Sequence, residues 1–260
     1  SYPLSHEGRE ELSAPLSAGR RGVGGEVASV PLCEVELELK SGSPGQLFRL
    51  ALELLNDFPL RLENSSKAER GYALCCGDGL PPAKAVSVAL DTETSVNSAF
   101  KAIAWNCLGH LHTNETGMLA GLDIEYLHQM RVALRRLRSA LSIFSAVFSK
   151  AAFMPVAQEL KWLLDQFGPA RDWDVFVMET LAEVSIGFPG HPGLLALRQE
   201  CARLHHLHRD AARGAVESPR YTEMMLRFGA WLSEEPWLSQ RDPAALIELF
   251  GTGSADAPVQ

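Results

Sequence analysis

Residues 94–250 have the pattern of successive helices separated by short interruptions, and this pattern restricts most of the chain to a helical bundle. Ala, Leu, Arg and Glu dominate these segments, and all four residue types favour helix formation. Gly and Pro mark the interruptions, as at 187–190 and 218–219. The expected helices lie near 95–115, 123–149, 153–167, 170–184, 192–215 and 220–233.

The preceding residues have a mixed pattern. Residues 33–40 alternate strictly between polar and apolar side chains, which is the period of a strand. A serine followed by proline then precedes apolar residues at helical spacing and predicts a helix over 44–56. A second strand-like run covers 71–76, and a break rich in Gly and Pro follows at 77–82. We therefore predict an α+β chain in which partial antiparallel β structure precedes an all-α helical bundle.

The first predicted strand carries its charges on one side, because residues two apart share a face. That face presents Glu34, Glu36, Glu38 and Lys40. Three carboxylates in a row repel one another unless something cationic neutralises them. One interpretation is a solvated edge strand. The other is a site for Mg²⁺ or Mn²⁺, which prefer carboxylate oxygens, with Lys67 and Arg70 available to hold phosphate oxygens.

Residues 33–42, 57–61 and 66–72 resemble the C-terminal half of a CYTH domain, the triphosphate tunnel family that includes bacterial inorganic triphosphatases. The resemblance implies that Glu34, Glu36 and Glu38 help to bind Mg²⁺ or Mn²⁺. It also implies phosphate-binding, catalytic roles for Lys40, Lys67 and Arg70. The family has a second acidic strand, Glu-x-Glu-x-Lys, which residues 1–30 do not contain, so we expect a partial β tunnel.

A second charged pattern lies on the predicted helix over 123–149. His128, Arg131, Arg135 and Arg138 are spaced three and four apart and form one stripe. One interpretation is a solvated basic face, or arginines neutralised by acids on neighbouring helices; the candidate acids are Asp165, Asp172 and Asp174. The other interpretation is an anion site. A polyanion such as polyphosphate suits a stripe of several turns better than one small phosphate does.

Residues 128–138, 168–175 and 218–221 are similar to the signatures of CHAD domains, and the similarity spans about 94–235. CHAD domains are all-helical, bind polyphosphate through basic residues and often follow a CYTH domain. The resemblance therefore implies a polyphosphate site formed by His128, Arg131, Arg135, Arg136, Arg138 and Arg171. The family has a second helical repeat, which residues 236–260 do not contain, so we expect only its first half.

Composition excludes several classes of protein. The net charge of −8 argues against a dedicated nucleic-acid-binding protein. The five cysteines, with no CxxC spacing, predict neither a disulfide framework nor a zinc finger, and indicate a reducing, cytoplasmic location. No apolar run is long enough for a membrane span.

The chain starts with Ser1, which we interpret as the sign of a fragment or a processed product. Three histidines at 205, 206 and 208 are expected on a solvated face.

The expected organisation has five parts: an irregular segment at 1–25, a partial CYTH-like domain at 26–80, a linker at 81–93, a partial CHAD-like domain at 94–250 and a tail at 251–260. The expected function is metal-dependent hydrolysis of inorganic triphosphate, with a helical domain that binds polyphosphate. The alternatives are a non-catalytic polyphosphate-binding module and a purely structural helical scaffold. The expected partners are inorganic triphosphate or polyphosphate, with no membrane, and a homo-oligomer is possible.

Overall fold

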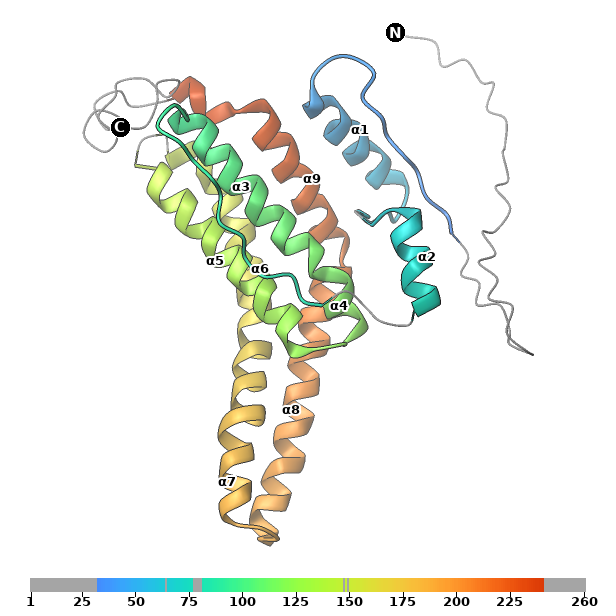
Figure 1. Ribbon diagram of the computed structural model, residues 1–260, viewed down its shortest axis with the longest axis vertical. Helices are drawn as coiled ribbons and strands as arrows, with labels where there is room; N and C mark the ends of the chain where they lie inside the picture. The colour runs from blue at the N-terminus through green and yellow to red at the C-terminus, as the bar shows by residue number, and fades with distance from the viewer. Residues whose placement is uncertain (1–31, 64, 77–80, 147, 149, 241–260) are drawn as a thin grey trace. The chain divides into compact units, whose positions relative to one another are not determined.

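The computed structural model (Figure 1) describes residues 32–63, 65–76, 81–146, 148 and 150–240. These residues belong to two compact units. The smaller unit contains 32–36 and 65–76, and the larger contains the other described residues. The expectations for 1–25, for 251–260 and for most of the break at 77–82 lie outside the described residues.

Helices make up both units, and Figure 1 labels most of them. The smaller unit contains α2, Lys67–Cys76. The first helices of the larger unit are α1 Pro44–Asp57, α3 Val96–Thr113, α4 Glu115–Ala120, α5 Ile124–Phe144 and α6 Lys150–Val175. The later elements are the π-helix η1 Phe176–Leu181, α7 Ala182–Gly187, α8 Pro192–Glu217, α9 Pro219–Glu234 and the 3₁₀-helix η2 Pro236–Gln240.

The predicted α+β class is wrong, because the described residues form no β-sheet and therefore no partial tunnel. Residues 32–40 are extended and exposed but have no partner strand. Residues 71–76, predicted as a strand, are the second half of α2. A capping box explains this helix: Ser66 Oγ accepts a hydrogen bond from the Glu69 amide at 3.1 Å, and Glu69 Oε2 accepts one from the Ser66 amide at 2.7 Å.

Most of the other observed helices lie where the spacing of apolar residues in the sequence predicts them. Helix α1 begins where the Ser-Pro signal places it, with Ser43 Oγ accepting from the Gly45 amide at 3.3 Å. One expected boundary is absent, because α6 runs through Pro169, where we predicted a break. The flanking Phe167 and Ala170 are fully buried. Their burial outweighs the hydrogen bond that a proline removes inside a helix.

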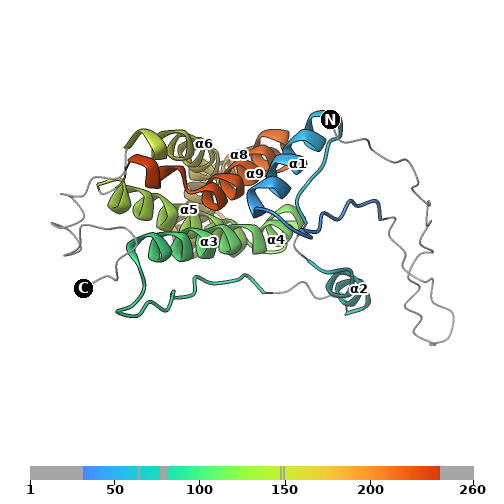
Figure 2. The same cartoon turned by 90° about the horizontal axis from the view of Figure 1, so that it is seen from above.

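The core of the larger unit lies between α3, α5, α6 and α9, which pack side by side (Figure 2). Phe100 is at its centre, with ring centroids 5.0 Å from Phe144 and 5.0 Å from Trp237. Both Phe100 and Trp237 are fully buried. Helix α1 packs on the outside of α9. Among the described residues, none of the helices has the length and apolar character that a bilayer crossing needs.

An extended segment of residues 81–95, which we call the strap, runs beside α3 in both views (Figures 1 and 2). Buried side chains hold it in place. Asn114 Oδ1 accepts from the Ala83 amide at 3.0 Å, and Asn114 Nδ2 donates to the Ala83 carbonyl at 3.1 Å. His110 Nε2 lies 2.9 Å from the same carbonyl and 3.1 Å from Gln129 Oε1. Both acceptors therefore favour a proton on Nε2.

The continuous run of α6, η1 and α7 packs against α8 as a long antiparallel hairpin (Figure 1). Asp174, at the end of α6, is fully buried. Its Oδ1 lies 2.7 Å from His205 Nε2 and 3.6 Å from Arg209 Nη1, both on α8. The expected solvated histidine face is therefore incorrect for His205. His208 stacks on Trp173, with ring centroids 6.3 Å apart.

Candidate functional site

Helix α5 separates apolar from basic side chains. It begins after Asp123, whose Oδ1 accepts a hydrogen bond from the Glu125 amide at 2.8 Å. Met130, Leu134 and Leu137 face the core and are buried. Because residues three and four apart share a helix face, the basic residues lie outside this core face: Arg135 and Arg138 are exposed, and Arg131 is half-buried.

The basic stripe of α5 consists of His128, Arg131, Arg135 and Arg138. Within the part of the chain that the structure describes, none of these four side chains has a hydrogen-bonded or ion-paired partner. At a rise of about 1.5 Å per residue, the stripe extends over about 15 Å. It is therefore a row of basic side chains that the described part of the chain does not neutralise by direct contact.

Arg131 is the most buried arginine of the stripe and lies against α6. A Cβ atom at Gly168 would come within 3.4 Å of Arg131 Nη1, so this glycine leaves room for the guanidinium. Burial lowers the pKa of Arg131, and the charge of nearby Asp172 opposes that shift. The positive charges of Arg135 and Arg171 lower the same pKa further. Three guanidinium groups from two helices therefore share one electrostatic environment.

The three acids that were candidates to neutralise this stripe have different partners. Asp165 forms an ion pair with Lys161 at 2.6 Å. Asp174 is buried in the hairpin and contacts His205. Only Asp172 is close enough to Arg131 to affect its pKa, and it is exposed. Gly168 begins the CHAD-like segment 168–175, but residue spacing alone predicts no role for it. Its lack of a side chain is what allows the Arg131 guanidinium to pack closely against α6.

Arg136 belongs to a different face of α5. Its Nη2 donates to the Val86 carbonyl of the strap at 3.0 Å and to Asn106 Oδ1 of α3 at 2.9 Å. Its Nη1 is buried and has no hydrogen-bond partner among the described residues. The structure therefore places Arg136 between α3 and α5, away from the stripe with which we grouped it.

In the smaller unit, the predicted acidic and basic residues do contact each other. Lys67 Nζ lies 2.9 Å from Glu34 Oε1 and 2.8 Å from Glu36 Oε1. Arg70 Nη2 lies 2.5 Å from Glu34 Oε2. Hydrogen bonds from Lys67 and then from Arg70 hold the pKa of Glu34 below its ordinary value. These two cations, expected to bind triphosphate, therefore bind carboxylates of this chain.

The carboxylates of this segment do not form a site that fits a divalent metal. Glu34 and Glu36 accept from Lys67, and Glu38 forms its own ion pair with Lys40 at 2.5 Å. The described residues contain no group of three or more His, Cys, Asp or Glu side chains that could hold a metal ion. The Mg²⁺ or Mn²⁺ site stays a prediction that this arrangement does not favour.

Comparison with known proteins identifies the helical unit. The family model for the CHAD domain matches residues 102–253, which is more than half of the chain. A crystal structure of the CHAD domain from the plant Ricinus communis is similar, with 38% sequence identity and a TM-score of 0.54. The alignment covers 66% of this chain and 57% of that chain, so this chain spans little more than half of its length. The CHAD match excludes 26–76, where the CYTH resemblance stays unconfirmed.

Proposed function

Because the chain belongs to the CHAD domain family, we propose that it binds linear polyphosphate through the basic stripe of α5 and Arg171 of α6. One observation carries this proposal. A row of basic side chains, unpaired within the described residues, extends along one helix, and a partly buried arginine lies within it. The match of residues 102–253 to the CHAD domain family does not depend on which ligand the stripe binds.

The electrostatics of the stripe favour a polyanion. Like charges three and four residues apart destabilise a helix by roughly 0.2–0.5 kcal/mol per pair, so a bound anion relieves repulsion that the free protein carries. The partly buried Arg131 is less screened by solvent than an exposed arginine is. A ligand with one phosphate can contact one or two guanidinium groups. A chain of phosphates can contact the whole row, which extends over about 15 Å.

A hydrolytic function has weaker support. It rests on the CYTH resemblance, and the described residues contain no β tunnel. Lys67 and Arg70, the cations assigned to the phosphoryl group, are engaged with Glu34. We therefore propose a binding module and keep triphosphate hydrolysis as the activity to test against it.

The test is titration calorimetry with long-chain polyphosphate at two salt concentrations. Arg131→Gln and Arg135→Gln should each weaken binding about fivefold and reduce the slope of log K against log salt by about one, because each removes one phosphate contact. Arg227→Gln is the matched control, since Arg227 is exposed on α9 and pairs with Glu223. Affinity that is unchanged in the Arg131→Gln/Arg135→Gln double variant would overturn the proposal.

A second assay separates binding from catalysis. Release of phosphate from tripolyphosphate in the presence of Mg²⁺ is measured for the full chain and for Glu36→Gln. The proposed binding module predicts no release above the buffer rate in either protein. Release that falls with Glu36→Gln would establish the hydrolase instead.

A further inference from the structure

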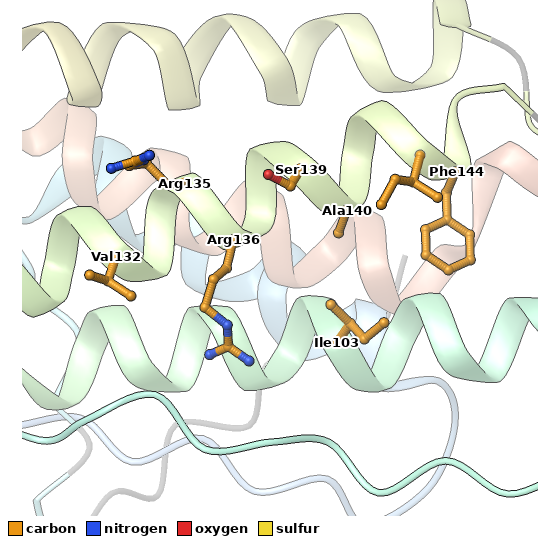
Figure 3. A pocket seen from close by; sticks show the side chains of 8 residues that line it. Ile103, Val132, Arg135, Arg136, Ser139, Ala140 and Phe144 are labelled. Atoms are coloured by element: carbon orange, nitrogen blue, oxygen red, sulfur yellow. The ribbon is translucent and has the colours of Figure 1, made fainter.

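An open groove of about 490 Å³ lies over the seam between α3 and α5 (Figure 3). Its polar lining residues are Arg135, Arg136 and Ser139. Its apolar lining includes Ile103, Val132 and Ile143. Figure 3 shows Arg136 and Ile103 between the two helices, whereas Arg135 extends from the other side of α5. The groove therefore has cationic and apolar parts next to each other.

Arg136 is a cation whose hydrogen bonding is incomplete. Its two observed hydrogen bonds, to the Val86 carbonyl and the Asn106 amide oxygen, are made to neutral acceptors. Its Nη1 is buried without a partner, and within the described residues no carboxylate pairs with Arg136. A buried donor without an acceptor and a partly buried charge without a counterion both cost free energy. The cost of the uncompensated charge falls when an anion binds at Arg136.

The rest of the groove does not suit a bare polyanion. Ile143 is 58% exposed and lies two turns beyond Arg136 on the same helix. Val132 and Ile103 extend the apolar surface toward Arg136. Ser139 offers a hydroxyl that can donate to a phosphate oxygen. A ligand that covers all of these groups has an anionic end and an apolar body, whereas polyphosphate would leave the isoleucines in water.

We propose that this groove binds a phosphate monoester that carries an apolar chain. The phosphate lies at Arg136 and Ser139, Arg135 lines the groove beside them, and the apolar chain extends in one direction along the seam, over Ile103 and Ile143. The ligand is either a free phosphate ester or the headgroup and proximal chain of a lipid such as phosphatidic acid. Because Arg135 belongs to both the groove and the basic stripe, ligands at the two sites weaken each other.

The test uses n-octyl phosphate as the probe, with inorganic phosphate and n-octanol as the two half-ligands. Octyl phosphate should bind the full chain at least about tenfold more tightly than either half-ligand, because only it covers both parts of the groove. Ile143→Gln and Arg136→Gln should each weaken its binding about tenfold. Leu207→Gln and Arg227→Gln, both exposed and outside the groove, are the matched controls.

Arg136→Gln also removes the contact with the strap and can disturb folding, so Ile143→Gln is the decisive variant. Octyl phosphate that binds no more tightly than inorganic phosphate would overturn the proposal. Equal binding to Ile143→Gln and to the unchanged protein would overturn it as well. Ile143→Gln should keep its affinity for polyphosphate, so failure of this site is distinguishable from failure of the basic stripe.

Vesicles distinguish the two sources of the ligand. Vesicles of phosphatidylcholine with and without phosphatidic acid are sedimented with the full chain and with Ile143→Gln. Retention that requires both phosphatidic acid and Ile143 would assign the groove to a lipid. Binding of soluble octyl phosphate without retention on vesicles would assign it to a free phosphate ester.

Discussion

Replacing Gly229 by Ala tests how α1 is held on α9. A Cβ atom at Gly229 would lie 2.3 Å from Phe48 Cε1 and 2.6 Å from Phe48 Cζ, far inside van der Waals contact. The Phe48 ring must therefore move. It is also stacked on Trp105 of α3, with centroids 6.1 Å apart and planes at 28°. A shift of the ring therefore disturbs the contacts of α1 with both α9 and α3.

The expected cost follows from two opposing effects. Overpacking of this kind costs about 1–3 kcal/mol. Alanine stabilises a helix interior by about 1 kcal/mol relative to glycine. Contacts as short as 2.3 Å place the overpacking cost in the upper part of its range, at about 2–3 kcal/mol. The net loss is therefore about 1–2 kcal/mol, which lowers Tm by about 2–8 °C for a chain of this length. Gly214→Ala on α8 is the control, because a Cβ atom there has nothing within 4 Å and should raise Tm by about 2–4 °C.

Differential scanning calorimetry and urea unfolding provide the measurement. In a Phe48→Ala background, Gly229→Ala should no longer reduce the free energy of unfolding, because the clashing ring is then absent. A Gly229→Ala protein as stable as the parent, or more stable, would refute the reasoning. It would mean that Phe48 does not rest on Gly229 and that α1 does not dock on α9 in this register.

Three further changes test other parts of the helical unit. Burial lowers the pKa of His110 below its ordinary value of 6.5, so the unfolded chain binds a proton at this residue at a higher pH than the folded chain does. The free energy of unfolding should therefore fall as the pH drops below about 6.5. In urea titrations, His110→Gln should flatten this pH dependence. Trp237 Nε1 donates to Asn97 Oδ1 at 2.8 Å, and Asn97→Leu should cost about 1–3 kcal/mol in the same assay, by leaving that donor unpaired. At Gly117, a Cβ atom would lie 2.1 Å from Tyr126 Cε1, so Gly117→Ala should lower Tm by several degrees, and an unchanged Tm would contradict this packing.

The helices after residue 94 were predictable because their periodicity and their caps agree. Asp123 and Ser218 both cap the helices that follow them, as their positions in the sequence suggest. The run at 71–76 was predicted wrongly, because a short apolar run fits a strand and a buried helix equally well. The capping box of Ser66 and Glu69 was the readable signal that decides for a helix.

The candidate site was predictable only in part. The spacing of Arg131 and Arg135 places them on one face of α5, and the structure agrees. Their proximity to Arg171 depends on how α6 packs against α5, and no local pattern encodes that packing. The contact of Asp174 with His205 likewise depends on the register of a long hairpin. Such contacts between distant residues require the three-dimensional arrangement.

The strap has a consequence for how freely its sequence can change. Before Ser95, whose hydroxyl caps α3, its observed hydrogen bonds to the helices all use its main chain: the amide and carbonyl of Ala83 and the carbonyl of Val86. The side chains that specify its path are Asn114, His110 and Arg136, which belong to the helices. Saturation mutagenesis should therefore find Ala83 and Val86 permissive to most residues other than proline at 83, which would remove the donated hydrogen bond. Their helical partners should tolerate few replacements.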